Sequence, residues 1–442
     1  MKPIADEEKR IVHFLKRTSF GVTGADMEEV RRMGISDYLE QQLHPESMAD
    51  QQSDEKLAKL KTLNLTNQEL LELYPRAKDQ KRTPQMNMNQ MRGPRIVVDE
   101  LQQAKMLRAV YSRRQLYEMM VDFWSNHFNV YARKGPNRWL VTSYDRDTIR
   151  PNALGQFREL LVATAQSPAM LYYLDNWVSV SPDSWKRRRN KRRKRTLKKG
   201  LNENYARELL ELHTLGVNGG YTQKDVEEVA RCFTGWTIRR PRKIGTFRFN
   251  SRQNDNGVKW VLGTPIPAGG GMEDGMRVID LLAEHPSTAN FICSKLVRRF
   301  IADDPPPRLV KEAAAVFRQT GGDIRSVLRV ILNSPEFYSS EYQQAKIKKP
   351  VEFVASSLRA LNAESDGRRF LQRHLRRMGE PLFLARPPTG YPDFAEQWIS
   401  PATLLARLNF AMDLTTNRIR GTRVKARQSD AMRLAAPEFQ RR

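Results

Sequence analysis

The densest set of chemically active side chains lies between residues 202 and 215, where the sequence reads NENYARELLELHTL. The segment is typical of a helix, and Gly216 directly after it is a helix stop. On a helix, residues three or four positions apart share a face. The polar face of this helix consists of Glu203, Asn204, Arg207, Glu208 and Glu211. Three carboxylates, an amide and a guanidinium are therefore predicted to lie together.

Two interpretations of this polar face are open. In a cleft where one glutamate has a raised pKa, Glu208 and Glu211 would act as acid/base groups or ligand carboxylates, oriented by Arg207. Glu203 and Asn204 would then contact the substrate. The alternative is a ladder of salt bridges that ties the helix to its neighbours and performs no chemistry.

A second candidate segment, FWSNHF, spans residues 123–128. His127 follows Phe123 by four residues and sits among aromatic side chains. Across a pair of helices it could approach Glu208 and act as its acid/base partner, with Asn126 in contact with the substrate. The alternative is a packing motif with one satisfied polar group.

Other patterns narrow the predicted reaction. The chain has no nucleophile elbow, no P-loop and no dinucleotide-binding glycine motif. His213 falls among leucines and away from the carboxylates, so the helix carries no i, i+4 pair of metal ligands. Trp236, directly after Thr234-Gly235, is either a core anchor or a platform for a stacked sugar or base. The predicted chemistry is hydrolytic acid/base catalysis, with or without a metal ion, and no cofactor is specified.

Positive charge is concentrated in two segments. The chain has 75 Lys and Arg residues against 50 Asp and Glu, a net charge of +25. Residues 186–199 contain eleven basic residues and no acid, and residues 417–442 contain eight basic residues and two acids. Such runs bind polyphosphates and anionic lipid surfaces at low salt. The residues expected to make these nonspecific contacts are Arg187, Arg188, Arg189, Arg192, Arg193, Lys194 and Arg195.

The run at residues 186–199 contains no aromatic residue, so it predicts no sequence-specific reading of nucleic acid. A solvated loop whose charge limits aggregation is the alternative. The same run supports a second function hypothesis, a non-enzymatic binding or scaffold protein. In that hypothesis the basic linker and tail contact polyanions or an acidic partner.

Helical periodicity dominates the chain and predicts an all-α fold, a large irregular assembly of helices. The exception is residues 245–262, where alternation of Phe247 and Phe249 with polar residues and a turn at residues 255–257 predict one small β-hairpin. The predicted regions are an N-terminal helical part (1–177), a basic linker loop expected to be disordered (178–200), a central helical part with the signature helices and the hairpin (201–345), a C-terminal helical part packed on the rest (346–416) and a basic tail (417–442).

The chain carries no sign of a membrane or secretory protein. No apolar run reaches the ~18–20 residues of a membrane span, and the first ten residues, MKPIADEEKR, lack a signal-peptide pattern. We therefore expect a cytoplasmic location. Cys232 and Cys293 form neither a disulfide framework nor a zinc motif.

Several motifs resemble a bacterial family catalogued as domain of unknown function 1800. Its central signature matches residues 202–216, GYT at residues 220–222 and ARCFTGW at residues 230–236. Further motifs run from HFLKRTSFG at residues 13–21 to LLARLNF at residues 404–410. The resemblance implies a mostly helical protein without an established activity. It also implies a partner, because such proteins resemble those often encoded beside the domain-of-unknown-function 1501 family, relatives of the alkaline phosphatase superfamily.

One motif departs from that resemblance. Members of the family often carry His-Asp-x-Gly-x-Lys between the hairpin strands, whereas residues 254–259 of this chain read NDNGVK. Asn254 stands where the histidine is expected. The missing histidine argues against a metal role for this turn.

Overall fold

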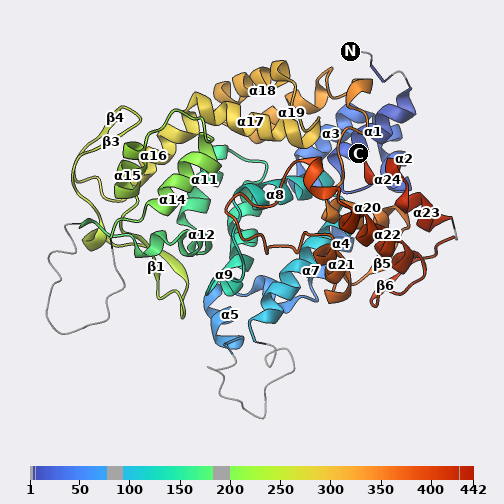
Figure 1. The fold of residues 1–442 in the computed structure, drawn as a ribbon, viewed down its shortest axis with the longest axis horizontal. Helices are drawn as coiled ribbons and strands as arrows, with labels where there is room; N and C mark the ends of the chain where they lie inside the picture. The colour runs from blue at the N-terminus through green and yellow to red at the C-terminus, as the bar shows by residue number, and fades with distance from the viewer. Residues whose placement is uncertain (1–2, 5, 77–92, 183–199, 428) are drawn as a thin grey trace, which may run out of the picture.

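The computed structural model describes residues 3–4, 6–76, 93–182, 200–427 and 429–442. Most of these residues are helical, as Figure 1 shows, so the all-α prediction is confirmed. The residues predicted to contact polyanions, between Arg187 and Arg195, lie outside the described ranges. Among the described helices, none combines the length and the apolar character that crossing a membrane requires.

Short helices open the chain and lead to two longer ones. They are α1 (Glu7–Thr18), α2 (Gly24–Met33), α3 (Ile35–Leu43), η1 (Pro45–Ser47), α4 (Gln51–Leu57), η2 (Lys61–Asn64), α5 (Asn67–Leu73), α7 (Arg95–Tyr111) and α8 (Gln115–His127). Asp6 caps α1 by accepting hydrogen bonds from the backbone N–H groups of the first turn. In the same helix the ring of His13 donates through Nε2 to the carbonyl oxygen of Phe337, 2.8 Å away and 324 residues later. The first helix is thus held by a distant part of the chain.

The middle of the chain contains two helical segments with π-type hydrogen bonding, η4 and η6. The elements are α9 (Asn137–Ser143), η4 (Tyr144–Ile149), α10 (Arg150–Asn152), α11 (Phe157–Gln166), α12 (Pro168–Tyr173), η5 (Asn176–Val178), α14 (Glu203–Glu208), η6 (Leu209–Thr214) and α15 (Gln223–Cys232). On either side of the undescribed residues 183–199, the backbone N–H of Val180 donates to the carbonyl oxygen of Gly200 at 3.2 Å. The two ends of the predicted linker are therefore hydrogen-bonded to each other.

Strands between residues 236 and 266 form two hairpins rather than the single one expected. In the first, β1 (Trp236–Arg239) pairs with β2 (Thr246–Phe249); in the second, β3 (Lys259–Val261) pairs with β4 (Thr264–Ile266). The predicted pairing of residues 247–249 with 258–262 is wrong. Each strand pairs with a partner across a shorter turn, and β1 begins at Trp236, four residues after the end of α15 at Cys232.

The rest of the chain returns to helices, with one short ladder near the end. The elements are η7 (Ser251–Gln253), α16 (Glu273–Glu284), α17 (Pro286–Phe300), α18 (Pro307–Gln319), α19 (Ile324–Asn333), η8 (Ser340–Tyr342), α20 (Pro350–Ala360), β5 (Glu364–Ser365), α21 (Arg369–Arg377), η9 (Ala395–Trp398), α22 (Pro401–Thr415), β6 (Thr422–Arg423), α23 (Asp430–Ala435) and α24 (Pro437–Gln440). The basic tail is part of the fold, because β6 pairs with β5 and Arg442 is almost completely buried.

A main hydrophobic core joins most of these elements, and two smaller clusters lie around η2, α5, α7 and α9. The buried side chains of the main core come from positions between Ile11 and Leu434. In Figure 1, α17, α18 and α19 run along one edge of the molecule, between a group containing α11–α16 and a group containing the first and last helices. α17 therefore links the signature helices to the opposite end of the molecule, and both candidate regions described next lie against it.

Candidate functional site

The signature helix changes its hydrogen bonding halfway along. Asn202 caps α14 by accepting a hydrogen bond from the Asn204 backbone N–H at 2.9 Å. From Leu209 the pattern widens to the π type, so that the Leu215 N–H donates to the Leu210 carbonyl oxygen at 2.8 Å. Such π segments occur frequently at functional sites. The sequence predicted a continuous α-helix, and the π turn alters the direction in which Glu211 projects relative to Glu208.

Arg207 takes part in a small surface network on α14. Its guanidinium lies 3.5 Å from a Glu203 carboxylate oxygen and donates to the Gln223 side-chain oxygen at 2.9 Å. Gln223 in turn donates to Glu203 at 2.8 Å. The predicted Glu203–Arg207 pair is present, and α15 contributes a partner that the sequence did not indicate. Because the pair is about 40% exposed, its contribution to stability is small.

Glu208 and Glu211, which we call the helix-face pair, lie in a half-buried environment with two tyrosines. Burial and then the charge of Glu211 raise the pKa of Glu208, while Arg207 acts in the opposite direction. The Tyr221 hydroxyl donates to the carboxylate of Glu211 at 3.2 Å. Burial and the charge of Glu208 also raise the pKa of Tyr173. Two carboxyl groups and two phenols thus influence one another on this face.

His127 reaches the signature segment but does not contact the helix-face pair. Its Nε2 lies 3.1 Å from the carbonyl oxygen of His213, so the neutral ring donates from this nitrogen. Burial, followed by the charge of Lys295, lowers the pKa of His127 well below its usual value. The ring packs 4.5 Å from Phe128 and 6.2 Å from Phe291, measured between centroids. These contacts hold η6 against α8. They agree with the alternative in which residues 123–128 are a packing motif.

Trp236 cannot serve as a stacking platform for a substrate. The side chain is fully buried, with its ring centroid 5.0 Å from that of Phe233 and 5.4 Å from that of Phe247. A Cβ atom at Gly275 would lie 2.7 Å from the indole, so that glycine lets the helix pack directly on the ring. The substrate-binding role predicted for Trp236 is wrong, and the core-anchor alternative describes it.

The side chain of Asn126 binds the backbone of a loop. Its amide nitrogen donates to the Tyr391 carbonyl oxygen at 2.8 Å, and its amide oxygen accepts from the Tyr391 N–H at 2.7 Å. Gly390 beside it has a φ of +73°, and a Cβ there would lie 2.5 Å from Asn126 oxygens. Asn204 is exposed and donates to the Leu174 carbonyl oxygen at 3.3 Å. Both amides therefore fix backbone segments.

A small cavity lies beside Asn126. The sequence analysis did not identify the charged residues that line it. The cavity has a volume of about 30 Å³, enough for one or two water molecules. Its polar lining includes Lys105, Asp122, Asn126, Asn129, Lys349 and Glu380. Asp122 lies one helical turn before Asn126, a spacing that could have revealed it. Nothing local in the sequence links Asp122 to Glu380.

The carboxyl groups of this cavity have very different pKa values. Burial disfavours the charge of Asp122, but Lys105, 2.6 Å away, and Arg299 outweigh it and lower its pKa to about 2. Burial and then the charge of Asp122 raise the pKa of Glu380 to about 7. Glu380 accepts a hydrogen bond from the Val351 N–H at 2.8 Å. One acid is thus ionised while the other exchanges its proton near neutral pH.

Further buried ions surround the cavity. Glu352 lies 2.6 Å from Arg299 and 3.1 Å from Arg442, and Lys349 donates to Asp393 at 2.8 Å. We call the four acids of this region, of which Asp393 is partly exposed, the buried cluster. Its members are Asp122, Glu352, Glu380 and Asp393.

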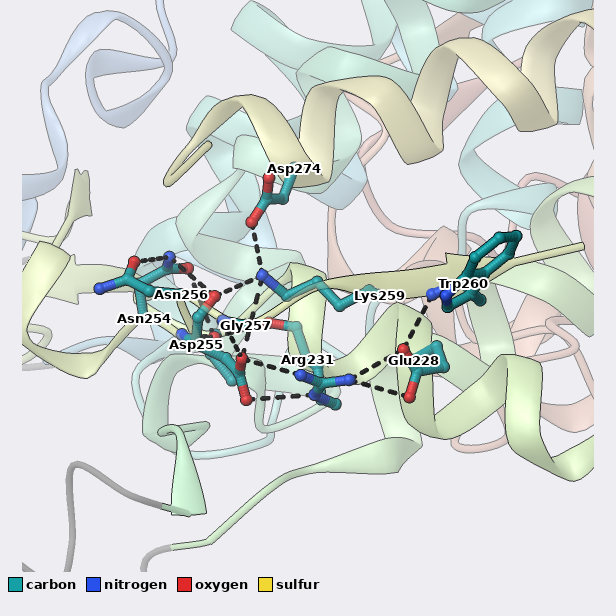
Figure 2. A network of polar contacts seen from close by, with 10 residues as sticks. Glu228, Arg231, Asn254, Asp255, Asn256, Gly257, Lys259, Trp260 and Asp274 are labelled. Atoms are coloured by element: carbon teal, nitrogen blue, oxygen red, sulfur yellow. Dashed lines mark hydrogen bonds and ion pairs between the residues drawn. The ribbon is translucent and has the colours of Figure 1, made fainter. Parts of the chain in front are cut away.

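The turn at residues 254–259 forms an ion network that ties α15, β3 and α16 together. Figure 2 shows the fully buried Lys259 ammonium between Asp255 and Asp274, 2.6 Å from the Asp274 carboxylate. Arg231 contacts both Asp255 and Glu228, at 3.1 Å and 2.9 Å. Lys259 thus supplies the cation that these two aspartates share. Over the described ranges, no three His, Cys, Asp or Glu side chains gather as a metal site.

Comparison with protein families places the chain in one of them. A family model described as a protein of unknown function, DUF1800, matches residues 13–441, nearly the whole chain. The protein belongs to this family, as the resemblance of its motifs implied. Comparison with curated proteins and with solved structures gave no match.

Proposed function

We propose that this protein is a hydrolase whose acid–base groups are Glu208 and Glu211. The observation that carries the proposal is their arrangement, two half-buried carboxyl groups on one helical face with a tyrosine hydroxyl on one of them. Neighbouring carboxyl groups whose environments differ can divide the roles of acid and base. Because both side chains are only half buried, a substrate can reach them without opening the core.

In this mechanism each carboxyl group has one task. Glu208, whose pKa is raised by burial and by Glu211, keeps its proton to a higher pH and donates it to the leaving group. Glu211, held by the Tyr221 hydroxyl, accepts a proton from the attacking water. Arg207 lies beside the pair, attached to Glu203 and Gln223, and faces anionic parts of a substrate. His127 acts as a positioning residue through the His213 carbonyl group.

The test is a screen with matched variants. The purified protein is assayed against nitrophenyl esters, phosphates and glycosides, beside Glu208→Gln and Glu211→Gln. Loss of a general acid or base lowers the rate by roughly 10²–10⁴-fold. Glu227→Gln on α15, an exposed glutamate outside the site, is the matched control and should retain the parent rate. A parent that cleaves no substrate class, or Gln variants as active as the parent, would overturn the proposal.

The non-enzymatic alternative is a binding protein that contacts polyanions or an acidic partner. It rests on residues 186–199 and on the tail, where the side chains of Arg423, Lys425 and Arg427 are exposed. A partner from the domain-of-unknown-function 1501 family and a cytoplasmic location stay predictions from the sequence. Deletion of residues 186–199 should remove most retention on heparin, and unchanged retention would count against this alternative.

A further inference from the structure

A row of arginines covers the exposed side of α21. Arg369, Arg373, Arg376 and Arg377 are all exposed, at spacings of three, four and eight residues that place them on one face. Successive turns of a helix are about 5.4 Å apart, so the row presents a guanidinium at every turn. In the described part of the chain no ion pair joins these four side chains to an acid. The row is therefore available to an external anion.

A cavity opens at the start of this row. Its volume is about 400 Å³, within the range of small-molecule sites. Arg368, Arg369 and Phe370 line it from the α21 side, and Arg420 lines it from the turn before β6. The two segments are held together because the Asp366 N–H donates to the Gly421 carbonyl oxygen at 2.8 Å. The cavity thus belongs to a fixed part of the fold.

Phe370 forms a layered aromatic and cationic surface inside this cavity. The guanidinium carbons of Arg369 and Arg420 lie 4.9 Å and 5.8 Å from the centre of its ring. Arginine planes and aromatic rings are the groups on which unstacked nucleobases lie in single-stranded nucleic-acid sites. The cavity wall also includes the carboxylate of Asp366, which disfavours a phosphate there and can accept a hydrogen bond from a ring N–H group of a base.

We propose that α21 and the turn at residues 418–421 form a binding surface for single-stranded nucleic acid. Phosphates lie along the arginine row, and one unstacked base enters the cavity at Phe370. A membrane surface fits less well, because the apolar residues Leu371, Leu375 and Met378 of α21 are buried in the protein. Over the described ranges, none of the large exposed apolar side chains lies on α21, while four lie on α22, which contacts it: Leu404, Leu405, Leu408 and Met412. This surface is independent of the proposed hydrolase site.

Binding of a labelled oligothymidylate by the full chain tests the phosphate row. The variant Arg373→Gln/Arg376→Gln/Arg377→Gln removes three exposed charges. It should weaken binding and reduce the slope of log affinity against log salt concentration by about 2, since each lost phosphate contact accounts for ~0.7 of that slope. The matched control is Arg308→Gln/Lys311→Gln/Arg318→Gln on α18, where the side chains are also exposed. Equal slopes for the two triple variants would overturn the proposal, because binding would then follow net charge alone.

The base site and the lipid alternative have their own measurements. Phe370→Leu should weaken binding of oligothymidylate and leave binding of inorganic polyphosphate unchanged; an equal loss for both would refute the base site. Vesicles containing phosphatidylserine provide the third probe. If the α21 triple variant loses vesicle binding but keeps the parent affinity and salt slope for oligothymidylate, the surface binds lipid and the proposal is wrong.

Discussion

The helix-face pair and the buried cluster are built from the same kinds of side chain and differ in exposure. Glu208 and Glu211 lie half buried, with Arg207 nearby. Glu352 and Asp122 lie almost completely buried between lysines and arginines. In the first region water screens the charges, so a substrate can compete for them. In the second region Asp122 and Glu352 are shielded from water and depend on their cations, whereas Glu380, which forms no ion pair within the described ranges, has a raised pKa.

Together with the proposed function, this difference predicts different tasks for the two regions. Removing one member of a buried ion pair leaves an uncompensated charge, which costs far more free energy than loss of an exposed pair. The buried cluster is thus expected to control stability, and the helix-face pair to control chemistry. The four predictions that follow separate these tasks, from the largest expected effect to the smallest.

Glu352→Ala should have the largest effect on stability. The glutamate lies 2.6 Å from Arg299 and 3.1 Å from Arg442. In the variant Arg442 loses this carboxylate, and Arg299 keeps only Asp122, 3.5 Å away. We expect the free energy of unfolding to fall by about 3–5 kcal/mol, measured by chemical denaturation. Glu227→Ala, an exposed control, should stay within ~0.5 kcal/mol of the parent. Equal effects of the two variants would contradict the stabilising role of the buried cluster.

Glu380→Gln should change how stability depends on pH. The pKa of Glu380 is raised from 4.5 to about 7, so the folded state holds a proton that the unfolded state has lost in this window. The parent is therefore destabilised as the pH rises from about 4.5 to about 7, by on the order of 3 kcal/mol. The amide has no proton to lose, so the variant should be free of this decline. Denaturation at a series of pH values checks it, and parallel curves for parent and variant would refute it.

Glu208→Gln should affect activity while leaving stability almost unchanged. The half-buried carboxyl group has a raised pKa, so its ionisation disfavours the folded state as the pH rises. Replacing it by an amide should change the free energy of unfolding by less than about 1 kcal/mol, in the stabilising direction above its pKa. A large loss of stability would instead assign Glu208 to structural support. Thermal melts beside the hydrolysis assay make the comparison.

Arg207→Ala should have the smallest effect on stability. The ion pair with Glu203 is exposed and 3.5 Å long, which corresponds to about 0–1 kcal/mol. Added salt should remove even this difference, because screening weakens exposed pairs. Repeating the denaturation in high salt is the check. A loss comparable to that of Glu352→Ala would remove the distinction between the two regions.

Local patterns predicted the fold better than they predicted the site. Helical spacing identified the polar face of α14, including the Glu203–Arg207 pair, because both depend on neighbours within one turn. The predicted strand pairing was wrong because several segments had similar strand patterns. In the structure each strand pairs with the neighbour across the shortest turn. Asp122 and Glu380 were missed because α8 and the loop after α21, which are distant in the sequence, bring them to one cavity.

Burial also could not be read from residue type alone. Trp236 and His127 belong to types that often bind ligands, yet tertiary packing encloses both. The π turn at η6 likewise has no simple sequence signal. What a helix face contacts depends on the elements that pack against it, and local spacing does not contain that information.

During synthesis, the hydrogen bond from His13 to Phe337 cannot form until Phe337 has been added to the chain. A ribosome adds about 5–20 residues per second, so the 324 residues between donor and acceptor take roughly 15–65 seconds. Throughout that interval α1 exists without its acceptor, and Phe14 lacks the ring of Phe337 that packs 6.3 Å from it. The nascent chain therefore presents an unfinished apolar helix to the cell, the kind of surface that chaperones bind. The packing of α1 is thus completed only after Phe337 has been synthesised.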